Sequence, residues 1–101
     1  MSTLDVYVKL TRVGRNVVLA ICDVELLGRT LRQDKMVFQI RDEFYNGEKT
    51  TVEEAVAMIN NSNIVNMVGC KCVDMAIQKG YVHPEAVLNI EGVPHAQILK
   101  L

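Results

Sequence analysis

The stretch that decides the predicted fold is IVNMVGCKCVDMAIQKG, residues 64–80. Drawn as an α-helix, it has apolar side chains around most of its circumference, and the remaining narrow polar stripe consists of Asn66, Lys71, Asp74 and Gln78. We therefore predict one helix from about Ile64 to Lys79, capped by Asn63 and ended by Gly80. A helix this apolar belongs in the middle of its domain.

Two strands are predicted at the start of the chain. Residues 4–10 alternate apolar and polar side chains, which is typical of a strand with one solvent-facing side. Residues 17–22 are apolar at every position, as expected for a strand that is covered on both faces. The segment 12–16 between them contains Gly14 and predicts a short hairpin loop.

The middle of the chain predicts shorter elements. Asp23 is a good N-cap for a short helix, which Gly28 weakens, and residues 36–41 alternate as a third strand. Residues 44–49 indicate a loop with its turn at Asn46–Gly47. Thr51 and Glu54 form a capping box before a helix that residues 60–63 end.

Two short strands, Ala86–Ile90 and Ala96–Leu101, complete the predicted order β-β-(short α)-β-α-α-β-β. This order is typical of an α+β fold, a two-layer sandwich with helices on one face of a mostly antiparallel sheet. The length of 101 residues suits a single domain over residues 1–101.

Composition narrows the classes of function. The net charge is −1, which gives no global attraction to nucleic acid or anionic lipid, although residues 1–41 carry seven basic and four acidic side chains. No stretch approaches the ~20 apolar residues that span a bilayer, so no membrane partner is predicted. Three cysteines without regular spacing favour free thiols, a reducing compartment and a cytoplasmic location.

No metal, cofactor or catalytic residue is predicted. Cys70 and Cys72 would point roughly 200° apart on a helix, so we interpret both as buried structural thiols rather than metal ligands. The adjacent Asp42 and Glu43 do not form a carboxylate pair on a strand, and single scattered glycines provide no phosphate-binding loop.

His95 follows Pro94 and lies near Gly92, which together constrain the backbone around an imidazole. It either presents a group that titrates near neutrality or forms a local hydrogen bond that locks a tight turn. The residues alone favour the turn-locking role.

An RNA-binding surface has modest support in the sequence. Arg12 and Arg15 flank the hairpin tip, and Arg29 and Arg32 are neighbours if their segment is helical. Phe44 and Tyr45 in a loop could stack on unpaired bases. Alternatively, the arginines are solvated surface groups, which the pI of about 6.1 favours.

Four segments together carry a family resemblance. They are Asp23-x-Glu25-Leu26-Leu27-Gly28, Glu43-Phe44-Tyr45-x-Gly47, Asn66-x-Val68-Gly69 and Ile90-x-Gly92-Val93-Pro94-His95-Ala96-Gln97. In this order they resemble the archaeal domain-of-unknown-function family four hundred and twenty-four. The resemblance implies a cytoplasmic protein without a nameable activity, with a role near translation or RNA. Backbone requirements explain Gly28, Gly47, Gly69, Gly92 and Pro94, but they do not explain the polar Asn66, His95 and Gln97.

Three hypotheses follow. The first is a non-enzymatic binding module for RNA or ribosomal particles, using Arg12, Arg15, Arg29 and Arg32 with Tyr45 and His95 as contacts. The second is a small ligand-binding protein or enzyme centred on His95, with Asn66 and Gln97 nearby in space. The third is a protein-interaction subunit, such as a homodimer; no DNA partner is predicted. Convergence of Tyr45, Asn66 and His95 in a cleft would favour a ligand or catalysis, and dispersal with a basic face would favour nucleic acid.

Overall fold

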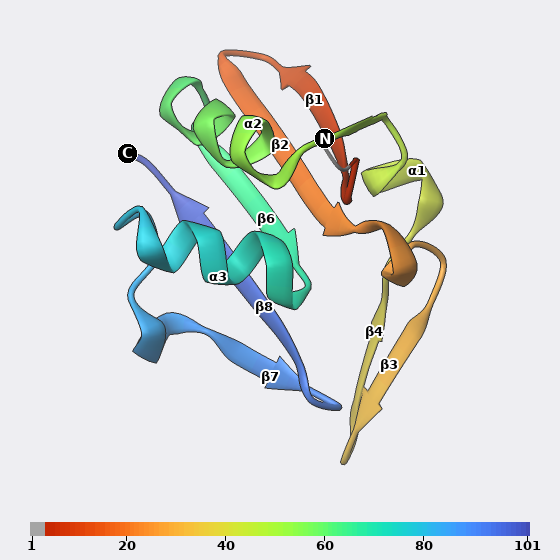
Figure 1. The fold of residues 1–101 in the computed structure, drawn as a ribbon. Helices are drawn as coiled ribbons and strands as arrows, with labels where there is room; N and C mark the ends of the chain where they lie inside the picture. Colours follow the sequence, from red (N-terminus) through yellow and green to blue (C-terminus); the bar gives the residue numbers. More distant parts are fainter. Residues whose placement is uncertain (1–3) are drawn as a thin grey trace.

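The computed structural model describes residues 4–101 and contains a six-stranded sheet and a separate two-stranded hairpin (Figure 1). The sheet has the order β5-β1-β2-β6-β8-β7, and its strands are β1 (Val6–Val13), β2 (Asn16–Asp23), β5 (Glu48–Thr50), β6 (Ile64–Val68), β7 (Leu88–Ile90) and β8 (Val93–Leu99). The hairpin consists of β3 (Thr30–Gln33) and β4 (Met36–Gln39). Among the strand pairs within residues 4–101, only β2–β6 is parallel, so the predicted α+β class with a mostly antiparallel sheet is confirmed.

The helices are short. They are the α-helices α1 (Asp42–Tyr45), α2 (Val52–Ala57) and α3 (Cys70–Gln78), and the 3₁₀ helices η1 (Val24–Leu26), η2 (Met58–Asn61) and η3 (Pro84–Ala86). None of the helices in residues 4–101 is long and apolar enough to cross a membrane.

The predicted central helix over Ile64–Lys79 is wrong in its first third. Ile64–Val68 is strand β6, hydrogen-bonded to β2 on one side and to β8 on the other. Ile64 and Val68, which share a face of β6 with Asn66, are apolar and partly or fully buried, so the sequence lacks the regular polar alternation that would have separated a strand from a buried helix. The chain changes from strand to helix at Gly69, where φ is +118°, and α3 then ends before Gly80 as predicted.

The predicted element order is also wrong between Asp23 and Thr50. The helix after Asp23 is only the single turn η1, because Gly28 adopts a φ of +85° and its N–H bonds to the carbonyl of Ile40 at 2.9 Å. The residues that follow form β3 rather than continuing a helix. Likewise, the predicted loop over residues 44–49 holds the end of α1 and the start of β5.

Other predictions are confirmed. Strands β1 and β2 form the predicted hairpin, whose last pair is Val13 with Asn16. Thr51 caps α2, since its hydroxyl accepts a hydrogen bond from the N–H of Glu54 at 3.2 Å. The Glu54 carboxylate, however, accepts from the Thr50 hydroxyl at 2.7 Å instead of completing the capping box.

The apolar core lies on both faces of the sheet. On one face, α2 and α3 cover alternate side chains of the central strands, among them Leu19, Ile21, Val65 and Met67. Figure 1 shows α3 running across β6 and β8 on this side. On the other face, η1, α1 and the β3–β4 hairpin cover Cys22, Val68 and Ile90. The prediction that all helices lie on one face of the sheet is therefore wrong, because α1 lies on the face opposite to α2 and α3.

A buried carboxylate fixes the start of α3. Asp23, only 1% exposed, accepts hydrogen bonds from the backbone N–H groups of Lys71 at 2.9 Å and Cys72 at 3.2 Å. Burial raises the pKa of Asp23, although these two N–H groups act in the opposite direction. A Cβ atom on Gly69 would lie 2.3 Å from the carboxylate carbon of Asp23, so this junction has room only for glycine.

The thiol prediction is half right. Cys22 and Cys72 are buried, but Cys70 is exposed because it occupies the outward side of the first turn of α3. Within residues 4–101, no group of three or more His, Cys, Asp or Glu side chains is placed to hold a metal ion.

Candidate functional site

A cleft of about 270 Å³ lies between the β3–β4 hairpin with α1 and the exposed side of β6 and β8. It is lined by Phe38, Gln39, Arg41, Phe44, Tyr45, Asn66, His95 and Gln97. The four residues that the sequence singled out as contacts (Tyr45, Asn66, His95 and Gln97) are all among them. Three segments that are far apart in the chain therefore meet at one site.

The floor of the cleft contains a paired amide. Asn66 on β6 and Gln97 on β8 are directly opposite each other in the antiparallel register, and the Gln97 Nε2 group donates to Asn66 Oδ1 at 2.7 Å. This bond uses one carbonyl and one N–H of the pair. Among residues 4–101 no further hydrogen bond engages these two side chains, so the Gln97 carbonyl and the other amide N–H groups are available to a ligand.

His95 lies on β8, one side-chain position along the same face from Gln97. Its ring is half-buried and contacts the ring of Phe38, with centroids 4.7 Å apart and planes tilted by 59°. Burial lowers the pKa of His95, so the imidazole is neutral at neutral pH and offers one donor and one acceptor.

The tight turn near His95 does not involve its side chain. Glu91 and Gly92 form the turn between β7 and β8, with φ values of +54° and +79°. Among residues 4–101, no hydrogen bond joins the imidazole to this turn, so the structure gives no support to the turn-locking role favoured from sequence.

The opposite wall of the cleft is aromatic and carries one cation. Tyr45 is 3% exposed, and its burial raises the pKa of the phenol. Phe44 packs edge-on against it with centroids 4.9 Å apart, yet remains 40% exposed and so leaves a ring available at the mouth of the cleft. Arg41, the N-cap residue of α1, supplies the positive charge of the lining.

The β3–β4 hairpin that carries Phe38 is fastened to the main sheet. Glu91 Oε1 accepts from the N–H of Arg32 at 2.7 Å, and the N–H of Glu91 donates to Gln33 Oε1 at 2.6 Å. This reciprocal pair joins the β7–β8 turn to β3. It holds the hairpin wall at a fixed distance from β8.

Sequence reasoning missed Phe38, Gln39 and Arg41 as site residues. Phe38 and Arg41 were assigned to a regular strand, and nothing in the local pattern shows which side of that strand faces β8. The only available signal was that Arg41 precedes the Glu43-Phe44-Tyr45 segment of the family resemblance.

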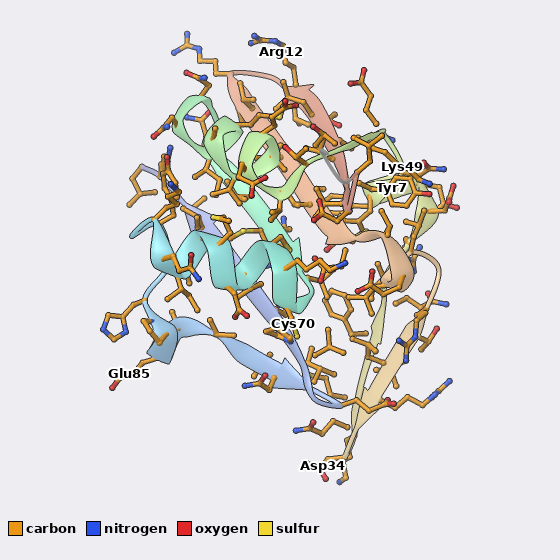
Figure 2. All side chains as sticks on the ribbon, in the orientation of Figure 1. Tyr7, Arg12, Asp34, Lys49, Cys70 and Glu85 are labelled. Carbon is orange, nitrogen blue, oxygen red and sulfur yellow. The ribbon has the colours of Figure 1, made fainter. Side chains whose placement is uncertain are left out.

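The four predicted RNA-contact arginines do not form one face. Arg12 and Arg15 lie at the β1–β2 tip, whereas Arg29 and Arg32 lie at or in β3, and not on a helix as predicted. Figure 2 shows Arg12 and Asp34, which is at the tip of the β3–β4 hairpin, at opposite ends of the molecule. The basic residues are therefore dispersed, while the polar contact residues converge.

The four glycines and the proline that the sequence analysis explained by backbone requirements occupy positions with little tolerance for another residue. Gly28, Gly69 and Gly92 have positive φ values, and a Cβ on Gly47 would lie within 2.2 Å of the Val8 carbonyl oxygen. Pro94 is buried in β8, and the carbonyl of Pro94 accepts from the N–H of Gly69 at 2.9 Å.

Comparison with known proteins identifies the family. A family described as "Protein of unknown function (DUF424)" matches residues 11–101, and the chain belongs to it, which confirms the resemblance found in the sequence. The structure is similar to the crystal structure of an uncharacterized conserved protein from Methanopyrus kandleri, with a TM-score of 0.77 and 26% identity. That similarity covers 95% of this chain and 93% of the other. No curated protein matches the chain.

Proposed function

We propose that this member of the DUF424 family is a non-enzymatic binding module whose cleft holds an unpaired base of cytoplasmic RNA. The observation that carries the proposal is the convergence of the Asn66–Gln97 amide pair with aromatic rings and Arg41 in one cleft of about 270 Å³. The proposal joins the two leading hypotheses from the sequence, since it keeps RNA as the partner and replaces the scattered arginines with the cleft around His95.

The chemistry of the lining matches that of a nucleobase. A base has flat π faces, which stack on aromatic side chains, and an edge on which hydrogen-bond donors and acceptors lie next to each other. The exposed ring of Phe44 offers a stacking surface, and the free carbonyl and N–H groups of Asn66 and Gln97 suit such an edge. Arg41 can pair with the phosphate.

The protonation states of two lining groups suit hydrogen bonding to an uncharged base. Burial raises the pKa of Tyr45 and lowers that of His95, so the phenol keeps its proton and the imidazole is neutral near pH 7. A neutral imidazole offers one hydrogen-bond donor and one acceptor.

The base in such a cleft belongs either to an RNA strand or to a free nucleotide. The RNA strand, in turn, is either free or part of a ribosomal particle. Fluorescence anisotropy with labelled single-stranded hexamers of A, C, G or U, followed by competition with the nucleoside monophosphates, separates the two sources. We expect a hexamer to bind in a salt-dependent manner and to be displaced only weakly by the monophosphate. Sedimentation of the protein with ribosomal particles at low salt tests the larger assembly.

Variants with matched controls locate the contact. His95→Ala should weaken hexamer binding roughly tenfold, in line with about 1–3 kcal/mol for a base in contact with an aromatic side chain. His83→Ala is the control, because His83 is the other histidine of the chain and is exposed at the start of η3. Asn66→Ala should relax the preference among the four hexamers, while Asn89→Ala on exposed β7 should not.

Two results would contradict the proposal. One is the absence of any binding of the four hexamers or the monophosphates at low salt. The other is binding that is unaffected by His95→Ala and Asn66→Ala, which would move the contact away from the cleft.

A further inference from the structure

A second hollow, of about 290 Å³, lies on the same side of the sheet as the cleft. Its floor is made by Thr11 and Val13 of β1 and by Val18 and Ala20 of β2, and Lys9 and Phe44 stand at its border. Residues Glu43 and Phe44 of α1 border the hollow, and no residue of the β3–β4 hairpin is among its lining residues. The floor is mostly apolar.

The hollow and the cleft adjoin each other at Phe44. Phe44 lines both, so its ring stands between them. Ala20 in the floor of the hollow pairs with Asn66, which in turn pairs with Gln97 in the floor of the cleft. Residues opposite one another in neighbouring strands lie on the same face, so the floors of the cleft and the hollow are on the same side of the sheet, with the buried Ala20 between the Asn66 side chain and β1.

The charges around the cleft favour a phosphate backbone that leaves the cleft toward the hollow on β1 and β2. A third hollow, of about 260 Å³, also adjoins the cleft, but Asp42 and Glu43 face Arg41 there and give it a negative balance. By contrast, residues 6–22, which form the β1–β2 hairpin, carry no acidic side chain. Lys9 lines the second hollow, where its ammonium group donates to the Glu43 carbonyl, and Arg15 lies at the hairpin tip, whereas Arg12 alternates with Thr11 and Val13 and so shares the opposite face with Leu10. Glu43 at the border of the second hollow is the single carboxylate in its lining.

We infer that the hollow on β1 and β2 is a second base subsite, so the ligand is a single strand of at least two consecutive nucleotides with Phe44 between their bases. This inference rests on the proposed function of the cleft. Single-stranded nucleic acid is bound by such a combination, a surface that accepts successive bases beside a positively charged path for the backbone. A lone nucleotide would fill the cleft and leave the second hollow empty.

The test compares adenosine 5′-monophosphate with the diadenylate pApA, and the cytidine pair in parallel, by isothermal titration calorimetry on the full chain. We expect the dinucleotide to bind at least about fivefold more tightly than the monophosphate, the low end of the stacking contribution of one further base. Equal affinities for both lengths would overturn the inference and leave the proposed function standing. Failure of every nucleotide to bind would overturn the proposed function itself.

Neighbouring positions on β1 give a matched pair of variants. Thr11 lines the hollow, whereas Leu10 points to the opposite face and is also exposed. Thr11→Glu should remove the advantage of the dinucleotide without changing the affinity for the monophosphate, and Thr11→Lys should increase that advantage. Leu10→Glu and Leu10→Lys add the same charges behind the sheet and should have little effect at ~0.15 M salt.

The Thr11 variants also show whether a second copy of the chain, rather than a nucleotide, covers this face. If the wild-type protein is a dimer that Thr11→Glu and Thr11→Lys both dissociate, as measured by sedimentation equilibrium, the face is occupied by a second copy. That result would overturn the inference.

Discussion

The junction at Gly69 offers a sharp test of how the sequence specifies the fold. Gly69→Ala places a methyl group where the Asp23 carboxylate lies, with the Cβ 2.3 Å from Cγ and 2.5–2.6 Å from the two oxygens. It also forces an L-residue into a φ of +118°. We expect this single methyl group to destabilise the protein strongly.

The expected loss has two sources. Holding a non-glycine residue at this backbone angle costs about 1–3 kcal/mol. Moving the carboxylate away weakens its bonds to the N–H groups of Lys71 and Cys72, and hydrogen bonds to charged groups contribute ~1.5–3 kcal/mol each. If both bonds are lost, these terms together predict a loss of roughly 4–9 kcal/mol, a large part of the ~5–15 kcal/mol that a typical domain has.

Urea unfolding followed by far-ultraviolet circular dichroism measures the loss, since the chain has no Trp. Gly80→Ala is the control: Gly80 also has a positive φ, +82°, but a Cβ there would meet nothing within 4 Å. It should cost only about 1–2 kcal/mol. A loss for Gly69→Ala no larger than that for Gly80→Ala would mean that the contact with the Asp23 carboxylate costs nothing.

A double-mutant cycle then separates the backbone strain at residue 69 from the steric clash with the Asp23 carboxylate. In an Asp23→Ala background the methyl group no longer meets a carboxylate, so Gly69→Ala should cost only the backbone term. If the cost is the same in both backgrounds, Asp23 is not what excludes a side chain at Gly69.

Three further predictions concern the caps and the buried ionisable groups. Thr51→Ala removes the N-cap of α2 and should lower the free energy of unfolding by about 1 kcal/mol; an unchanged urea midpoint would contradict the cap. In the native protein a thiol reagent should modify the exposed Cys70 rapidly but should not modify the buried Cys22 and Cys72. Burial also raises the pKa of Cys22 to about 12. Reaction of all three thiols should require unfolding of the protein. The pKa of Asp23 is raised in the folded state. At any pH between the pKa of Asp23 in the unfolded chain and its higher pKa in the folded protein, the folded protein therefore binds more protons than the unfolded chain. The wild type should therefore lose stability relative to Asp23→Asn as pH rises from about 4 through that window, and a gain measured by urea unfolding would contradict the direction of the shift.

Sequence patterns predicted the parts of the fold in which local and tertiary preferences agree. The β1–β2 hairpin alternates where one face is wet and becomes continuously apolar where β2 is covered on both faces. The cap at Thr51 and the stop at Gly80 are set by residues within a few positions of the helix end, so no distant partner was needed.

The patterns failed where a partner distant in sequence decides the local structure. Ile64–Val68 followed by Cys70–Gln78 is apolar enough to be one buried helix, and only pairing with β2 and β8 makes its first part a strand. Gly69 was visible within this segment, but its role depends on Asp23, which is 46 positions earlier. Similarly, β3 forms because Arg29 pairs back to Ile40, a contact that helix propensity does not report.

The sequence pointed to four of the residues that line the cleft, but not to their arrangement. Asn66, His95 and Gln97 were singled out because backbone demands do not explain them, and Tyr45 because an aromatic residue in a loop could stack on a base; neither reason requires knowledge of the fold. Their meeting depends on β6 being a strand, because only then does Asn66 lie opposite Gln97.

Register therefore couples the cleft to the core. Alternate residues of β6 face opposite sides, so Val65 and Met67 pack under α2 and α3 while Asn66 faces the cleft. A slip of one residue would bury the Asn66 amide beneath the helices and expose two large apolar side chains, which the hydrophobic core strongly opposes. Gly69 ends β6 at the point that keeps this register, since its N–H bonds to the Pro94 carbonyl of β8. A substitution that shifts Gly69 should accordingly reduce ligand binding in the folded fraction of the protein, although Gly69 lies outside the lining of the cleft.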